Sequence, residues 1–121
     1  MLALAVALAA GLGAVSRYII DQVVQHRVRG EYPYGTLLIN LTGSLLLGLI
    51  SGLAIHHGLP ATLTLLVGTG FAGGYTTLST WAWESLALAE TGHLLLAVSN
   101  IVGSFALGLT AAATGLGLAL L

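Results

Sequence analysis

Val67–Glu84 reads VGTGFAGGYTTLSTWAWE and lies inside an apolar segment that extends from just after Pro60 to about Ala89. As one straight helix the whole segment would be roughly 45 Å long, whereas the hydrocarbon core of a bilayer is about 30 Å thick. Its centre holds the pair Gly73–Gly74 and then four hydroxyl residues in five positions, which are poor helix formers. A broken helix is tolerated in a membrane only where it is buried in protein or lines a cavity. We therefore predict a helix that is broken near Tyr75, with an unbroken, tightly packed glycine helix as the alternative.

The composition of the remaining chain places this segment in lipid. Of 121 residues, 57% are hydrophobic and 6% are charged, whereas a soluble domain has about 25% charged residues. The net charge of −1 leaves no basic patch for nucleic acid, and without cysteine there is neither a disulfide framework nor a thiolate metal site. A soluble enzyme and a nucleic-acid binder are therefore excluded.

The chain has room for four membrane crossings of about 20 residues each, joined by short connections. We predict an all-α membrane protein with a single transmembrane domain over residues 1–121. The predicted segments are Leu2 to about Ile20, about Gly35 to Ile55, the residues after Pro60 to about Ala89, and His93–Leu121. Gly58 is expected to end the second helix.

The charges give a weak preference for one orientation. All three arginines, Arg17, Arg27 and Arg29, lie at or in the first connection, which the positive-inside rule places in the cytoplasm. This bias is small enough to permit insertion in both directions. Four short helices enclose little space, so we expect an oligomer to form any polar pathway.

Polar side chains at membrane depth indicate where such a pathway lies, because hydrocarbon penalises them. Asn40 lies in the second segment, and Asn100 and Ser104 form one stripe of the fourth at i and i+4. Amides and hydroxyls along one face are typical of a dehydrated path for a small ion. Hydrogen bonding between helices is the alternative role for all three.

Four pieces of the sequence, taken in order and spacing, resemble the Fluc (CrcB) family of fluoride channels over nearly the whole chain. These pieces are GLGAVSRY (11–18), YGTLLINLTGSLLLG (34–48), GFAGGYTTLSTW (70–81) and NIVGSFALG (100–108).

The resemblance implies an antiparallel, dual-topology dimer of four-helix subunits in the inner (plasma) membrane, with two fluoride pores. It also implies a structural Na⁺ at the dimer centre, bound by backbone carbonyls of Gly73 and Thr76. The pore residues that it implies are Asn40, Thr77, Leu78, Ser79, Trp81, Asn100 and Ser104.

The chain departs from the family at two of these positions. The family pattern TTFSTF is TTLSTW here, so that Leu78 and Trp81 replace phenylalanines, and Leu96 stands where a tyrosine is usual. Trp81 offers an electropositive ring edge and an indole N–H, whereas Leu78 offers neither. We expect a homodimer. Because of this departure from the family pattern, a heterodimer with a second, different subunit is the alternative.

Arg17 has three alternative roles. It can extend to the membrane interface, pair with Asp21 at i+4, or attract anions to a vestibule at the pore mouth.

Two rival classes stay open beside the channel. A proton-coupled four-helix exporter would need a carboxylate inside a helix, and Asp21 is expected at a helix end. A non-conducting membrane subunit would explain the glycines by packing alone. No enzyme activity is expected, because no nucleophile–base pair is evident at membrane depth.

Overall fold

Three helices of the computed structural model, which describes residues 1–121, are long and apolar enough to cross a membrane. They are α1 (Leu2–Arg27), α2 (Tyr34–His57) and α6 (Leu94–Leu118). All other regular elements are helical as well, so the predicted all-α membrane fold is confirmed at this level. Large apolar side chains are exposed along all three helices, as expected for surfaces in contact with lipid or with another chain.

The first helix is longer than predicted. We expected it to end near Ile20, but α1 continues without interruption to Arg27. The predicted boundary was wrong because neither glycine nor proline occurs between Ile20 and Gly30, so nothing stops the helix there. His26 and Arg27 lie in the last turn, where positive charge favours the carboxyl end of a helix.

The second and fourth helices agree with the sequence pattern to within a few residues. Gly58 follows α2 in the left-handed conformation, with φ = 65°, which confirms its predicted role at the end of this helix. α6 ends at Leu118 rather than Leu121. There a ring nitrogen of His57 lies 2.7 Å from the Ala119 carbonyl oxygen and joins the ends of α2 and α6.

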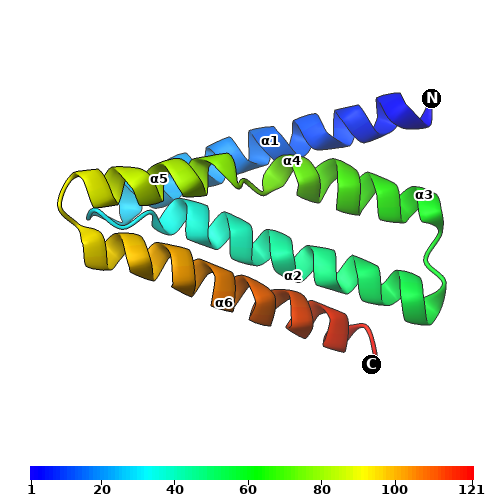
Figure 1. The fold of residues 1–121 in the computed structure, drawn as a ribbon. Helices are drawn as coiled ribbons and strands as arrows, with labels where there is room; N and C mark the ends of the chain where they lie inside the picture. Colours follow the sequence, from blue (N-terminus) through cyan, green and yellow to red (C-terminus); the bar gives the residue numbers. More distant parts are fainter.

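The third segment is divided. It consists of α3 (Ala61–Thr64), the π-helix η1 (Leu65–Ala72), α4 (Gly73–Tyr75) and α5 (Ser79–Glu90). Figure 1 shows α4 and α5 following each other along one side of the bundle, joined by a short non-helical link. In this link, Thr76–Leu78, the backbone of Thr76 is extended, with φ = −76° and ψ = 158°.

The helices pack in two principal pairs. α2 packs chiefly against α6, while α1 packs against η1 and α4 (Figure 1). Glycines allow both approaches, because a Cβ at Gly48 would meet the Ala112 carbonyl and one at Gly74 would meet the Ala10 carbonyl. Both chain ends lie at the end of the bundle at which α3 begins.

These close approaches predict a difference between two glycines of α6. A Cβ at Gly115 would meet the Leu45 carbonyl of α2, whereas a Cβ at Gly117 would meet nothing within 4 Å. We expect Gly115→Ala to lower the free energy of unfolding by about 1–3 kcal/mol, because α2 and α6 must separate. Thermal unfolding in detergent measures the effect, with Gly117→Ala as the matched control. Equal melting temperatures for the two variants would contradict the packing role.

Candidate functional site

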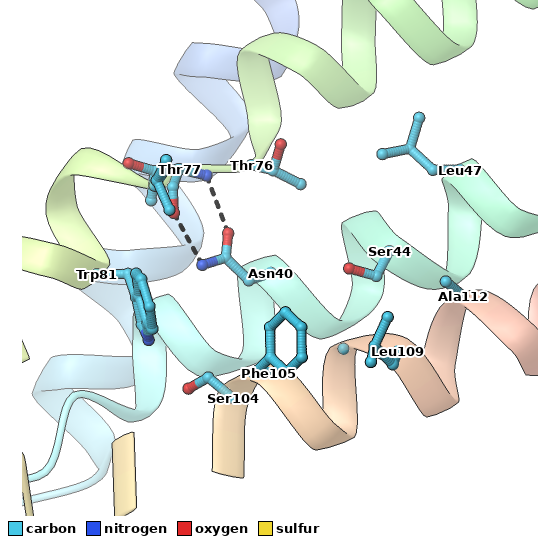
Figure 2. A pocket seen from close by; sticks show the side chains of 12 residues that line it. Asn40, Ser44, Leu47, Thr76, Thr77, Trp81, Ser104, Phe105, Leu109 and Ala112 are labelled. Carbon is cyan, nitrogen blue, oxygen red and sulfur yellow. Dashed lines mark hydrogen bonds between the residues drawn. The ribbon is translucent and has the colours of Figure 1, made fainter. Parts of the chain in front are cut away.

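An open groove of about 380 Å³ lies between α2, α6 and the link Thr76–Leu78 (Figure 2). Its polar lining comes from three separate elements of the chain. The lining residues are Asn40, Ser44, Leu47, Thr76, Thr77, Leu78, Trp81, Ser104, Phe105, Gly108, Leu109 and Ala112. None of these residues carries a formal charge. The groove therefore offers an ion hydrogen bonds and dipoles but no fixed charge of its own.

Asn40 and Thr77 are joined by two hydrogen bonds that close a ring. The Asn40 Nδ2 donates to the Thr77 carbonyl at 2.9 Å, and the Thr77 backbone N–H donates to Asn40 Oδ1 at 2.9 Å (Figure 2). The Asn40 amide therefore binds both the N–H and the carbonyl of Thr77, as the backbone of a neighbouring β-strand would. One Nδ2 hydrogen remains, because an asparagine amide has two donor hydrogens.

This pairing leaves backbone oxygen atoms uncovered beside the link. In a continuous helix the Thr77 N–H would donate to Gly73, but here it donates to Asn40, and the Gly73 carbonyl accepts no backbone hydrogen bond. The Thr76 carbonyl accepts one hydrogen bond, from Arg17 Nη1 at 3.3 Å. Carbonyl oxygens of unwound helices are suitable Na⁺ ligands, so Gly73 fits the implied ion. Thr76 fits it less completely, because a guanidinium already faces its oxygen.

Arg17 lies on the other side of the link. With Asp21 and Thr36 it lines a cleft of about 200 Å³, which Thr77 separates from the groove. The Arg17 side chain contacts the Thr76 carbonyl and forms no ion pair with Asp21. An Asp21 carboxylate oxygen is buried without a hydrogen-bond partner.

A hydrogen-bond network joins α5 to α6 below the groove. Asn100 is fully buried, and its Nδ2 donates to Ser85 Oγ at 2.9 Å. Its Oδ1 accepts the Ser104 hydroxyl at 3.2 Å, while its backbone carbonyl accepts the Trp81 indole N–H at 3.1 Å. Asn100 therefore holds two groove residues in place and does not itself line the groove. The sequence suggested the Trp81 N–H as a donor to an anion, but in the structure it donates to the Asn100 carbonyl.

The remaining predicted site residues are exposed. Leu78 lines the groove with 74% of its surface exposed. Ser79 and Gly73 are exposed and lie outside the groove.

Sequence reasoning missed three features. Ser44 and Phe105 line the groove, and Thr36 donates to a Glu84 carboxylate oxygen at 2.9 Å. Periodicity could have identified Ser44, which follows Asn40 by four residues on the same face. Phe105 carried no signal, because an apolar residue of a membrane helix has no distinct role by type. The Thr36–Glu84 contact joins residues 48 positions apart, so no local sequence pattern indicates it.

One aromatic side chain outside the spanning helices has a shifted pKa. Burial raises the pKa of Tyr32, and Tyr34 adds to the rise while the Ser104 hydroxyl opposes it. The raised pKa extends the pH range over which the Tyr32 phenol keeps its proton.

The geometry defines a class of protein: a helical membrane protein with an uncharged polar groove beside a short non-helical link. Residues 4–116 match the model of one family, described as CrcB-like protein, Camphor Resistance (CrcB). The chain belongs to this family.

Curated relatives agree over most of their length. A protein of Leifsonia xyli subsp. xyli, named fluoride-specific ion channel FluC 1, is 47% identical over 116 residues, which are 96% of this chain and 85% of that protein. Fluoride-specific ion channel FluC 2 of Mycobacterium tuberculosis is 47% identical over 110 residues, 91% of this chain and 84% of its own. The FluC 1 protein of Rubrobacter xylanophilus is 46% identical over 107 residues, 88% and 84% of the two chains. The similarity therefore includes the link, the groove and all three long helices.

The Asn40–Thr77 ring gives a prediction for an isosteric change. Asn40→Asp removes the N–H that binds the Thr77 carbonyl and places two oxygens against each other. We expect the free energy of unfolding to fall by about 1–3 kcal/mol, the penalty of a buried unsatisfied group. Thermal unfolding measures this loss, and amide exchange over residues 73–80 should become faster. Ser51→Ala, on an exposed position of the same helix, is the control. Exchange that is unchanged in Asn40→Asp would show that the ring does not hold the link.

Proposed function

We propose that this protein is a fluoride-selective channel that lets fluoride leave the cell passively across the inner membrane, lowering cytoplasmic fluoride. The observation that carries this proposal is the 47% identity, over 96% of the chain, to a relative named as a fluoride-specific ion channel.

The composition of the groove supports passive movement of a small anion. Its polar groups are amides and hydroxyls, and no residue that lines it can exchange a proton near neutral pH. The remaining Asn40 Nδ2 hydrogen can donate to an anion. Small, strongly hydrogen-bonding fluoride gains most from such donors once it is dehydrated, whereas larger chloride gains less.

The chain acts as an antiparallel dimer in this proposal. The groove is open on one side, and Leu78 projects from the link with most of its surface uncovered. Polar groups that face lipid are unfavourable, so a second copy in the opposite orientation would close the groove. Three arginines give only a weak orientation bias, which is compatible with dual topology. Within each copy the divided third segment provides the fourth crossing as a broken helix.

A sodium ion at the centre of the dimer belongs to the same proposal. The Gly73 and Thr76 carbonyls of each copy would hold it, and its charge would offset the oxygen dipoles that the link exposes. Arg17 donates to the same Thr76 oxygen, and from its cleft on the other side of the link its positive charge would attract anions to a vestibule at the pore mouth.

Transport can be tested directly in liposomes. We expect purified protein to release fluoride down its gradient, at least a hundredfold faster than chloride, with no dependence on a proton gradient. Ion-selective electrodes measure both anions, and empty liposomes are the control. Equal fluoride and chloride rates, or flux only with a proton gradient, would contradict a passive fluoride channel. Flux that appears only after a second family member is added would replace the homodimer by a heterodimer.

The sodium proposal predicts stabilisation without transport. An ion that binds only the assembled dimer stabilises it by mass action, by about 2.7 kcal/mol at a hundred times its Kd. We expect the dimer melting temperature in detergent to rise with Na⁺ but not with N-methylglucamine at equal ionic strength. Thr76→Ser should preserve the rise because the ligand is a backbone oxygen. A melting temperature that is indifferent to Na⁺ would contradict the site.

A further inference from the structure

The hydroxyl of Ser44 has no hydrogen-bond partner in the protein. Every other serine or threonine that is half-buried or fully buried has one, and four of these donate to the carbonyl four residues earlier, as Ser85 does to Trp81. Ser44 could make the same bond to Asn40 on its own helix, yet its hydroxyl turns into the groove. A hydroxyl at membrane depth without a partner in the protein is unfavourable, so its orientation requires an explanation.

The position of Ser44 connects it to Asn40. The two residues are four apart on α2, so their side chains lie about 6 Å from each other on one face. Figure 2 shows the Ser44 oxygen on the side of its Cβ that faces Asn40. The remaining Asn40 Nδ2 hydrogen and the Ser44 hydroxyl are therefore two donors one helical turn apart along the same groove.

The opposite wall leaves the Ser44 hydroxyl accessible. Gly108 of α6 faces it, and a Cβ built at Gly108 would lie 3.7 Å from Ser44 Oγ. Because residue 108 is a glycine, the space in front of the hydroxyl is free. Even the methyl group of an alanine at this position would cover the hydroxyl. Leu47, Leu109 and Ala112 continue the lining beyond this point with apolar surface. No protein group on that side competes for the Ser44 donor.

We propose that Ser44 is a second anion-binding donor, which receives the ion one turn beyond Asn40, and that Gly108 keeps this position open. The proposal rests on the function proposed above and adds a residue to its pathway. An anion that leaves the Asn40 amide meets the Ser44 hydroxyl before it reaches the apolar part of the groove. Two successive donors lower the barrier to movement, because the ion can bind the second donor before it leaves the first.

The experiment compares variants that separate donor chemistry from shape. Ser44→Ala removes the donor, and Ser44→Cys keeps most of the volume with a much weaker donor. Gly108→Ala keeps the donor and covers it, at a separation that is ordinary van der Waals contact. Ser51→Ala is the matched control, since Ser51 lies on α2, is exposed and stands outside the groove. Fluoride flux per dimer and dimer melting are measured for all four.

We expect Ser44→Ala and Ser44→Cys to lower fluoride flux about tenfold, the scale on which loss of one hydrogen bond to a charged group acts. Gly108→Ala should also lower flux several-fold, while Ser51→Ala should match the unmodified protein. Melting temperatures should remain within a few degrees throughout.

The outcomes separate this inference from the proposed function. If the unmodified protein conducts and Ser44→Ala conducts equally well, the inference is overturned and the channel stands. If flux falls only in proportion to dimer melting, Ser44 is a packing residue and the inference is likewise overturned.

A protein that conducts nothing would overturn the channel, and fluoride binding then decides the role of Ser44. Fluorescence of Trp81, which lines the groove, reports binding in a Trp83→Phe background. Binding that Ser44→Ala weakens about tenfold supports the donor. Unchanged or absent binding overturns it.

Discussion

The two hydrogen bonds between the Asn40 side chain and the Thr77 backbone hold the interrupted segment in place. Inside a membrane every backbone polar group needs a partner, and a gap in a helix leaves several without one. Asn40 supplies both a donor and an acceptor to the one link residue that is buried, Thr77. The Thr77 hydroxyl then donates to Thr80 Oγ1, and the Thr80 N–H donates back to Thr77 Oγ1, which starts α5. One amide thus fixes where the interruption ends.

The rest of the site depends on this placement of α5. Once α5 begins at Ser79, Trp81 and Ser85 face α6, and the buried Asn100 can bind both of them. The resulting contacts set the wall of the groove opposite Asn40. On the other side of the link, Arg17 reaches the Thr76 carbonyl only because that residue is extended. In a continuous helix Thr76 would not be extended, and the Thr77 N–H would donate to Gly73 instead of Asn40.

The sequence predicts the positions of the helices well because hydropathy and glycine placement act locally. Gly58 stops α2 by its own backbone freedom, and the long apolar runs identify α2 and α6 without knowledge of their neighbours. Partners are harder to predict. Asn40 is recognisable as a costly polar residue, but its partner is a backbone group 37 residues away. The role of Asn100 depends equally on Ser85 and Trp81, which only the packing of α5 on α6 brings near.

The arrangement also explains how assembly and conduction would be linked in the proposed dimer. The groups that an anion would use lie along an open groove at the side of a single chain, where lipid would otherwise meet them. Each uncovered donor therefore favours association with a second copy for the same reason that it favours a bound anion: it lacks a partner. Helices with so little buried apolar surface of their own would gain stability from such contacts in addition to glycine-mediated packing. A substitution that satisfies the groove donors within one chain would accordingly weaken both the dimer and the pathway, whereas one that only enlarges the groove would affect the pathway first.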